Sequence, residues 1–540
     1  MKTKWTLYFW ILNIFTAFLR LLFISSAGLT TDEAHYWVYS KFLSLSYFDH
    51  PPMIGYIIKV STLIFGDSVF AVRFPAVLIF FTASFIFYLC AEKLFDGKIA
   101  FAAVLLLNIM PVFSFFGAVI NVPDTPLALF WLLSFLLFIL ILKTEKKIYW
   151  HFLGFSLGFA MLSKYNAAAL AASILIFLLL SKRHRFILKT KEPYIALLES
   201  VLIFLPVIIW NYQNGFASFA FQFKHGFGSG GLPPLSLISF FRCLGAQSAY
   251  ISPPFFVLLS ASVYFCVKEF IKSGDMEIKE RNLLILSFCL PILILFNAVS
   301  LFNEILPHWP AMGYLSLTIY AAYIMEKNLN KKWFRNYIVL SYIFTALVIV
   351  AAVLHIKYKI IPIENFLPQE QALKIEHGIK KSEQIDITND LFGWQEIGKR
   401  INEIYASFPE GKKPFIFTYK SYLAGQLYFG IFTSGNIGKQ DASGSISGQK
   451  AMRIFCLSDR IDGYDFWQKD LDILKGKTGI FISSDYFYTE PSEYYGEAFT
   501  SYSKAEEFSV YRDGVKIKNF FIVICRGFDP DKMREEIKMR

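Results

Sequence analysis

Residues 5–27, WTLYFWILNIFTAFLRLLFISSA, form the first of a series of apolar runs that determine the fold class. A bilayer core about 30 Å thick needs about 20 apolar residues per helix, so this run is long enough to cross it. Its length and the later runs favour an uncleaved anchor over a signal peptide. Ten more candidate spans follow at about 72–91, 99–118, 126–142, 149–163, 166–181, 194–210, 251–267, 282–301, 312–325 and 337–355. The runs at 149–163 and 166–181 are short and nearly adjacent, so a re-entrant pair is the alternative for them. The sequence therefore predicts a mainly α-helical polytopic membrane protein with about eleven transmembrane helices.

The composition supports this class. Of the 540 residues, 55% are hydrophobic and 18% are charged, whereas soluble domains carry about 25% charged residues. These proportions exclude a disordered, collagenous or disulfide-scaffold protein and argue against a purely soluble enzyme. The net charge of +11 does not require a nucleic-acid partner, because the cytoplasmic loops of membrane proteins also collect Lys and Arg.

The loops differ in charge. The N-terminal segment and the loops on its side of the membrane hold twenty Lys and Arg residues, against five in the opposite loops. The positive-inside rule therefore places the N-terminus in the cytoplasm. An odd number of spans then places the C-terminal part outside.

The composition changes after about residue 357, where charges become frequent and no run is long enough to span. Helix-like stretches such as 394–406 lie between short strand-like stretches at 415–417, 453–455, 479–482 and 520–524. We expect a transmembrane domain over 1–356 and an extracytoplasmic, periplasmic α/β domain over 357–540, with a mobile loop at 435–448.

The six cysteines contain no C-x-x-C pair, which leaves a zinc ribbon without support. Cys456 and Cys525 share the C-terminal domain. A disulfide between them is one interpretation, but both lie in strand-like runs, which favours core residues.

Two adjacent carboxylates, Asp32 and Glu33, follow the first span in Thr31-Asp32-Glu33-Ala34-His35-Tyr36-Trp37. Carboxylates at a membrane interface are costly unless they are solvated, paired or bound to a cation. The apolar and aromatic residues after them can lower the local dielectric and shift a pKa, as a general base requires. The alternative is a solvated pair that ends the first helix. Composition leaves both interpretations open.

The second outer loop contains Asp124 in Asn121-Val122-Pro123-Asp124-Thr125-Pro126. Its simplest role is to cap the following helix, with Pro126 near the first helical position. Capping is compatible with function. Asp32, Glu33 and Asp124 are all predicted on one face of the membrane and at one depth, where they could converge on an external cavity.

Histidines and a lysine on the same face are candidate phosphate ligands: His50, Lys224, His225 and His308. Each can bind a phosphate or stabilise a leaving group. A single interfacial His beside Trp or Phe is, however, more typical of the aromatic belt. The role of Lys164 stays open, because a lysine at the end of a span can also extend its side chain to the outer surface without binding a ligand.

Five motifs occur in an order that resembles a known family. They are Asp32-Glu33-Ala34-His35-Tyr36-Trp37, Tyr47-Phe48-Asp49-His50-Pro51-Pro52, Pro123-Asp124-Thr125-Pro126, Leu162-Ser163-Lys164-Tyr165 and Pro307-His308-Trp309-Pro310. The set resembles the bacterial branch of the protein mannosyltransferase family, glycosyltransferase family 39, whose relatives include the aminoarabinose and galacturonosyl transferases of lipid A. The resemblance covers roughly 1–355, and the outer domain resembles the variable C-terminal domain of the same branch less distinctively.

The resemblance implies a GT-C fold with a catalytic transmembrane domain in a bacterial inner membrane. It also implies an inverting transfer from a polyprenyl-phosphate sugar to lipid A, a glycolipid or another envelope acceptor. The acidic residues of the family fall on Asp32, Glu33 and Asp124. Aminoarabinose transferases often carry a Lys where this chain has His50, and His is largely neutral at pH 7. Other candidates for that charge are Lys224, His225 and Arg242.

In the mechanism that this resemblance implies, Asp32 is the general base for an acceptor hydroxyl, or it orients an acceptor phosphate that needs no base. Glu33 and Asp124 would shape the acceptor site or share a divalent cation with Asp32. Carboxylates suit Mg²⁺ or Mn²⁺, although nothing in the sequence requires a metal. Cationic side chains would stabilise charge on the leaving phosphate.

Two other classes have many spans or an outer domain. A transporter or lipid flippase would carry charged residues deep within its spans, whereas the acidic candidates here gather at one interface. A binding or scaffold protein would need only one span as an anchor. A membrane enzyme is therefore favoured, with transport as the alternative.

Overall fold

The computed structural model describes residues 4–227, 234–368, 375–376, 378–435, 454–468 and 470–538. The chain divides into two compact units. Unit 1 consists of Met1–Ile24, Ser44–Ile54 and Arg73–Val350, and unit 2 consists of Ser25–Leu43, Gly55–Val72 and Ala351–Arg540. The division at Val350 lies near the expected boundary at 356, but two segments of the first outer loop belong with the C-terminal part of the chain.

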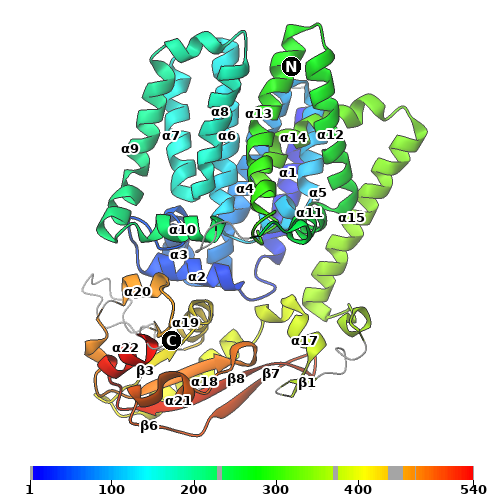
Figure 1. Ribbon diagram of the computed structural model, residues 1–540. Helices are drawn as coiled ribbons and strands as arrows, with labels where there is room; N and C mark the ends of the chain where they lie inside the picture. Colours follow the sequence, from blue (N-terminus) through cyan, green and yellow to red (C-terminus); the bar gives the residue numbers. More distant parts are fainter. Residues whose placement is uncertain are drawn as a thin grey trace. The chain divides into compact units, whose positions relative to one another are not determined.

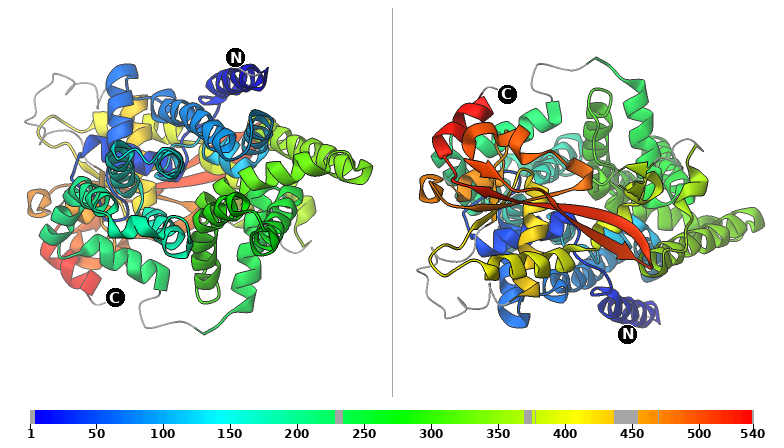
Figure 2. Two further views of the ribbon diagram at one scale, coloured as in Figure 1. Left: turned by 90° about the horizontal axis from the view of Figure 1, so that it is seen from above. Right: turned by 90° about the horizontal axis from the view of Figure 1, so that it is seen from below.

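Unit 1 is built from long apolar helices (Figure 1). They are α1 (Lys4–Phe23), α4 (Val69–Leu94), α5 (Gly97–Ile109), α6 (Asp124–Thr144), α7 (Ile148–Ser163), α8 (Ala168–Leu180), α9 (Glu192–Gln213), α12 (Pro253–Lys272), α13 (Met276–Val299), α14 (Ala311–Asn328) and α15 (Lys332–Tyr358). The left view of Figure 2 shows several of them nearly end on. Helix α7 packs against α6 and α9, and α13 packs against α8, α12 and α14. α4 begins in unit 2 and α15 ends there.

Every run predicted as a span lies largely on one of these helices. Within the described ranges, seven are long and apolar enough to cross a membrane: α1, α4, α6, α9, α12, α13 and α15. Helices α5, α7 and α8 are apolar but shorter, and a 3₁₀ turn, η2 (Tyr165–Ala167), leads into α8. The number of crossings therefore stays a prediction.

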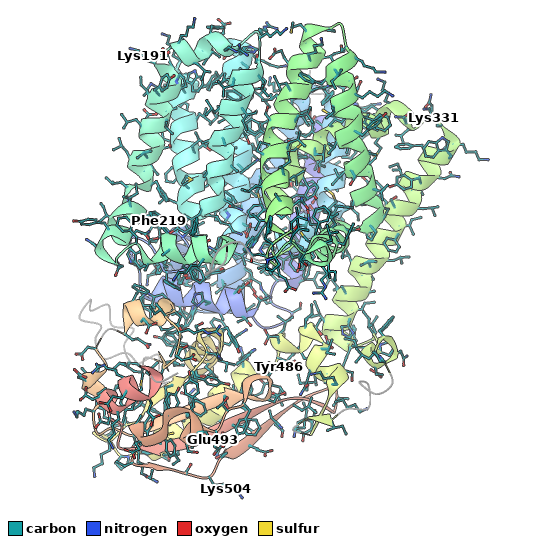
Figure 3. The ribbon with its side chains drawn as sticks, viewed as in Figure 1. Lys191, Phe219, Lys331, Tyr486, Glu493 and Lys504 are labelled. Carbon is teal, nitrogen blue, oxygen red and sulfur yellow. The ribbon has the colours of Figure 1, made fainter. Side chains whose placement is uncertain are left out.

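The core of unit 1 is a continuous cluster of apolar and aromatic side chains from these helices, including Trp131, Phe135 and Phe288. Figure 3 labels Lys191 and Lys331 toward one end of the unit and Phe219 toward the other. Two loop segments are helical as well, namely α10 (Ala217–Phe227) and α11 (Leu237–Ile251). A π-helical turn, η1 (Val112–Phe116), follows α5.

Unit 2 contains a mixed sheet. In the described part of the chain the strand order is β4 (Ile454–Cys456), β3 (Phe415–Thr418), β5 (Gly479–Ser484), β8 (Val515–Arg526) and β6 (Ser501–Tyr502), with β7 (Glu506–Arg512) also paired to β8. Strands β4, β3 and β5 are parallel and buried, and β8 is antiparallel to β5. A separate pair joins β1 (Ile375–Glu376) to β2 (Ile379–Lys380).

In its described part, unit 2 also contains the helices α17 (Lys381–Ile385), α18 (Trp394–Ser407), α19 (Ser421–Ser434), α20 (Gly463–Trp467), α21 (Pro491–Tyr495) and α22 (Pro530–Lys538), besides the helical segments of the first outer loop described below. The four predicted strands and the predicted helix at 394–406 are thus confirmed. The predicted mobile loop at 435–448 lies, beyond its first residue, outside the described residues.

All six cysteines are buried and free. Cys456 lies on β4 and Cys525 on β8, with β3 and β5 between these strands in the sheet. The interpretation of both as core residues is confirmed.

The first outer loop was predicted only as a connection, but it is mostly helical. It forms α2 (Thr31–Lys41) and α3 (Met53–Phe65). Helix α2 belongs to unit 2 and packs against α19. Trp37 of α2 contacts the rings of Tyr428, Phe429 and Phe432 edge-on, with centroids 5.1 to 5.4 Å away. Asp67 also contacts α2, because its carboxylate accepts a 2.8 Å hydrogen bond from the Trp37 indole.

Candidate functional site

The centre of the candidate site in unit 1 is Asp124, the first residue of α6. The N-cap of this helix is Pro123, which makes no side-chain capping bond. The turn is instead tied by Thr125, whose Oγ1 donates to the carbonyl of Ile120 and accepts from the backbone N–H of Val122. The prediction that Asp124 caps the helix is therefore wrong, and its carboxylate is available for other partners.

Lys164 supplies the first of these partners. Its Nζ lies 2.6 Å from Oδ2 of Asp124, and the two side chains are only 11% and 15% exposed. Lys164 follows the last residue of α7 in extended backbone, between that helix and η2. This break in the helix turns the lysine toward the start of α6. Lys164 is thus a partner of Asp124, and the pair belongs to the site although the sequence left the lysine unassigned.

His308 joins the same carboxylate from a third segment. Its Nε2 lies 4.0 Å from Oδ2 of Asp124, and the turn that carries it is closed by a hydrogen bond from the N–H of Ala311 to the His308 carbonyl. Burial lowers the pKa of His308 to about 4, an effect opposed by Asp124 and increased by Lys164. At neutral pH the ring is uncharged, so it suits hydrogen bonding better than charge neutralisation.

His50 lies close enough to Asp124 to interact with it electrostatically. The segment around His50 is fixed by α10, because Gln222 Nε2 donates a 2.6 Å hydrogen bond to the carbonyl of Asp49. The rings of Phe48 and Phe221 also meet, with centroids 4.6 Å apart. Helix α10 therefore supports the segment that carries His50.

Two side chains of the site keep unused hydrogen-bonding atoms. Oδ1 of Asp124 is buried and has no hydrogen-bond partner among the described residues. Both side-chain amide atoms of Asn166, two residues after Lys164, are likewise buried and have no hydrogen-bond partner among the described residues. Buried polar atoms are normally paired, so these atoms are suited to receive the hydroxyl groups of a ligand. No local pattern in the sequence singles out Asn166.

The acidic pair of the first outer loop lies in unit 2, and its two members differ. Glu33 is fully buried, and its Oε2 accepts from the N–H of Thr30 at 2.9 Å while Thr30 Oγ1 accepts from the N–H of Glu33 at 3.3 Å. This is a capping box. Asp32 is exposed in the first turn of α2. The interpretation of a solvated pair ending the first helix is therefore wrong, because the pair begins α2 and one member is buried.

The remaining candidates do not join the Asp124 cluster by any described hydrogen bond or ion pair. Lys224 is exposed on α10. Arg242 of α11 pairs with Glu304 at 3.2 Å, and both side chains are more than two-thirds exposed. His225 lies on α10, but its side chain is outside the described residues.

Within the described ranges, no group of three or more His, Cys, Asp or Glu side chains is placed to hold a metal ion. Asp32 and Glu33 belong to unit 2, and Asp124 belongs to unit 1. The carboxylate of Glu33 is already engaged by Thr30. The sharing of a divalent cation by these three carboxylates therefore stays a prediction.

Comparisons with known proteins match part of the chain by sequence and nearly all of it by fold. Residues 49–210 match the family described as dolichyl-phosphate-mannose-protein mannosyltransferase. The lipid A galacturonosyltransferase RgtD of Rhizobium johnstonii is 24% identical over 301 residues, covering 54% of this chain and 60% of that protein. The undecaprenyl phosphate-alpha-4-amino-4-deoxy-L-arabinose arabinosyl transferase 2 of Proteus mirabilis is 29% identical over 180 residues, 32% of each. This chain thus spans less than two thirds of the length of either relative.

The fold matches a solved structure over nearly the whole chain. ArnT from Cupriavidus metallidurans bound to undecaprenyl phosphate aligns with a TM-score of 0.61 and 14% identity, covering 97% of this chain and 98% of that one. The apo form of the same protein gives a TM-score of 0.57. The predicted GT-C fold and the resemblance to this glycosyltransferase family are therefore confirmed, and the chain is an integral membrane protein of that fold.

Proposed function

We propose that this chain is a membrane glycosyltransferase that moves a sugar from a polyprenyl-phosphate donor to an extracytoplasmic acceptor. The acceptor class is lipid A, a glycolipid or another envelope glycan, and the transfer inverts the anomeric configuration. One observation carries the proposal: a buried Asp124–Lys164 pair, approached by His308, is assembled from three of the family motifs and keeps an unpartnered carboxylate oxygen.

The ArnT-like fold supports the donor class. ArnT has been solved with undecaprenyl phosphate, and two relatives by sequence are named as transferases of lipid A or of an undecaprenyl-phosphate sugar. A hexose or pentose on a polyprenyl phosphate is therefore the substrate class to test first. The charge difference between loops supports a cytoplasmic N-terminus and a periplasmic domain over 357–540.

In the proposed reaction, an acceptor oxygen attacks the anomeric carbon of the donor sugar. The bond from that carbon to the phosphate oxygen breaks, and polyprenyl phosphate leaves with the electron pair. Where the acceptor is a hydroxyl, exposed Asp32 takes its proton as general base. Where the acceptor is a phosphate, it is already nucleophilic and Asp32 orients it.

The cluster in unit 1 has a separate role. Oδ1 of Asp124 accepts a hydrogen bond from a sugar hydroxyl, and Asn166 offers both a donor and an acceptor to the same ligand. Lys164 holds the Asp124 carboxylate in place through Oδ2. His308 and His50 are candidate hydrogen-bond donors to the phosphate oxygens, and Lys224, His225 and Arg242 are candidate cations for them.

Glu33 has a structural role in this proposal. Its carboxylate completes the capping box that starts α2, so it fixes the backbone of its neighbour Asp32 without touching substrate.

The test uses purified protein in lipid nanodiscs with a panel of undecaprenyl-phosphate sugars and an outer-membrane lipid extract. Mass spectrometry follows loss of donor and gain of a sugar mass on an acceptor. We expect donor consumption by the wild type and by Asp531→Asn, a matched control at an exposed ion pair with Lys475. Asp32→Asn and Asp124→Asn should lose most turnover. Folded wild-type protein that consumes no donor in the panel, or that moves intact lipid across the bilayer instead, would overturn the proposal.

A further inference from the structure

The first turn of α2, which carries Asp32, is held from its N-terminal side by the C-terminal part of the chain. The carbonyl of Leu29 accepts a 2.8 Å hydrogen bond from Gln426 Nε2 of α19. Thr31 Oγ1 donates a 2.6 Å hydrogen bond to Asp390 Oδ2. At Gly28, a Cβ would lie 2.3 Å from the Leu391 carbonyl oxygen, so only glycine allows this approach. Contacts at Gly28, Leu29 and Thr31 therefore hold the segment just before Asp32.

Asp390, whose side chain is 43% exposed, is itself anchored by two contacts. It lies on the 3₁₀ helix η5 (Ile387–Leu391), and its carbonyl accepts a 2.6 Å hydrogen bond from the Trp394 indole. Its carboxylate lies 3.7 Å from Nζ of Lys518, a side chain only 1% exposed. Lys518 in turn lies 4.2 Å above the Trp394 ring and donates to the carbonyl of Phe392. The carboxylate that receives Thr31 is thus fixed by a buried cation and by its own backbone.

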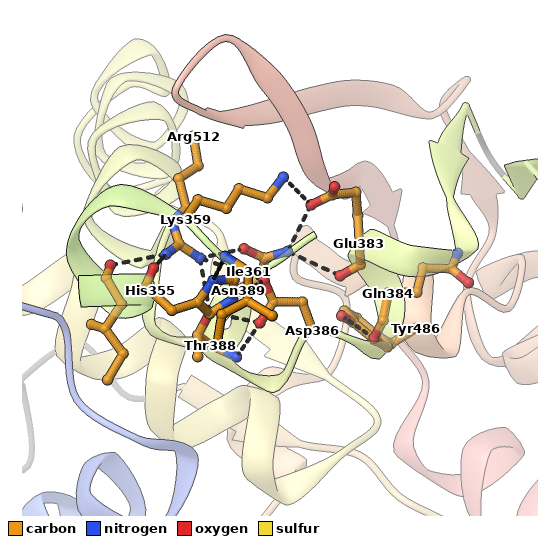
Figure 4. Close-up of polar contacts among 11 residues, drawn as sticks. His355, Lys359, Ile361, Glu383, Gln384, Asp386, Thr388, Asn389, Tyr486 and Arg512 are labelled. Carbon is orange, nitrogen blue, oxygen red and sulfur yellow. Dashed lines mark hydrogen bonds and ion pairs between the residues drawn. The ribbon is translucent and has the colours of Figure 1, made fainter. Parts of the chain in front are cut away.

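The other face of η5 is fixed to the end of α15 (Figure 4). Asp386, the N-cap of η5, lies 3.1 Å from Nε2 of His355 on α15. Arg512, at the end of β7, donates to Thr388 at 2.9 Å and to Asn389 at 2.7 Å.

The same guanidinium reaches the helix backbone. Arg512 donates to the carbonyls of His355 and Ile356. The side chains of Arg512 and Asp386 are at most 4% exposed. One five-residue turn therefore joins the end of α15, the β7–β8 hairpin and the start of α2.

We propose that η5 positions the first turn of α2, which carries Asp32. Asp390 is the positioning residue, because it holds this turn in place through its hydrogen bond with Thr31. This inference rests on the proposed function, in which Asp32 is the base. It gives the C-terminal domain a defined part in catalysis: the domain fixes the backbone that presents the Asp32 carboxylate to the acceptor. Asp390 itself touches no substrate.

The experiment compares Thr31→Val, Thr31→Ser and Asp390→Ala with the surface control Asp531→Asn in full-length protein in nanodiscs. The valine variant keeps the shape of threonine and removes only the hydroxyl. Two quantities are measured: kcat and KM for the polyprenyl-phosphate donor, and hydrogen–deuterium exchange of the backbone over residues 29–36.

For Thr31→Val and Asp390→Ala we expect kcat to fall about 10- to 100-fold, as for a small misplacement of a reacting group, with KM for the donor within about twofold. Exchange over 29–36 should accelerate about tenfold in both variants, while Thr31→Ser and Asp531→Asn should resemble the wild type. Unchanged exchange in Thr31→Val, or a serine variant as impaired as the valine variant, would overturn the inference. Wild-type protein that transfers no sugar would refute the proposed function, while the exchange data would still decide whether Asp390 holds α2.

Discussion

Lys164→Met should both destabilise unit 1 and impair transfer, because it leaves Asp124 buried without its cation. At 2.6 Å the Nζ–Oδ2 pair has a gross Coulomb energy of about 6 kcal/mol with an effective dielectric constant of about 20. Desolvation of both groups opposes most of that gain. Removing one partner of a buried pair nevertheless costs about 3–5 kcal/mol, since the remaining charge keeps its desolvation penalty. We expect a loss of free energy of unfolding in that range.

The pair can be isolated with a double-mutant cycle. Asp124→Asn should cost a similar amount, since it strands the buried lysine. The double variant carries no buried charge and should be less destabilised than the sum of the single variants, by about 2–3 kcal/mol. Titration with a denaturing detergent in mixed micelles measures the free energy of unfolding of the wild type, the two single variants and the double variant. Arg242→Met is the matched control, because its exposed ion pair should contribute about 1 kcal/mol or less.

Transfer assays separate the contribution of the Asp124–Lys164 pair to activity from its contribution to stability. Lys164→Met should lower kcat/KM by about 10²–10³-fold, the range for loss of one preorganised electrostatic partner, even at temperatures where the variant is fully folded. Single substitutions whose costs add within about 0.5 kcal/mol would show that the two side chains do not interact. A folded Lys164→Met variant with wild-type transfer would refute the role of the pair in the site.

Three further outcomes follow from unit 2. Glu33→Gln should retain both stability and transfer, because glutamine can also complete the capping box with Thr30, whereas Asp32→Asn should keep stability and lose turnover; thermal unfolding and donor consumption check both. Burial and the neighbouring carboxylate of Asp465 raise the pKa of Asp462 from 3.8 to about 6. The folded state therefore keeps a proton that the unfolded state loses, so the contribution of Asp462 to stability should fall by about 2.5 kcal/mol from pH 4 to 7, and Asp462→Asn should remove this contribution in denaturant titrations. Burial also raises the thiol pKa of Cys456 and Cys525, so maleimide at pH 7 should label neither until the protein is denatured, as mass spectrometry can show.

The helices and strands were predictable because their signals are local. A run of about 20 apolar residues indicates a membrane helix wherever it occurs in a sequence, and 479–482 indicates a buried strand by its β-branched and aromatic side chains. The Asp124–Lys164 pair was not predictable in this way. The two residues are forty positions apart, and their contact depends on how α6 packs against the end of α7. The only local signal was a lysine between two apolar runs, where a charge needs a partner.

The division of the chain into two units could not be predicted from the sequence for the same reason, because it depends on contacts between distant residues. Nothing local in 25–43 indicates that it packs against α19, more than 380 positions later. The contact became recognisable only in the structure, where Trp37 lies among the aromatic side chains of that helix. Asn166 was missed because its significance lies in what its amide lacks, and a sequence cannot show an unsatisfied hydrogen bond.

Asp32 and Glu33 show how local geometry gives two chemically similar neighbours different surroundings. Consecutive residues on a helix point to different sides, so Asp32 and Glu33 cannot both face one ligand once α2 forms. The pattern Thr30-x-x-Glu33 is a capping-box signature that was readable in the sequence. It engages the Glu33 carboxylate, so the proposed base is Asp32, the exposed member of the pair. A base shared between the two, or a cation held by both, would require the first turn of α2 to unwind, against the contacts of Thr31 with Asp390 and of Leu29 with Gln426.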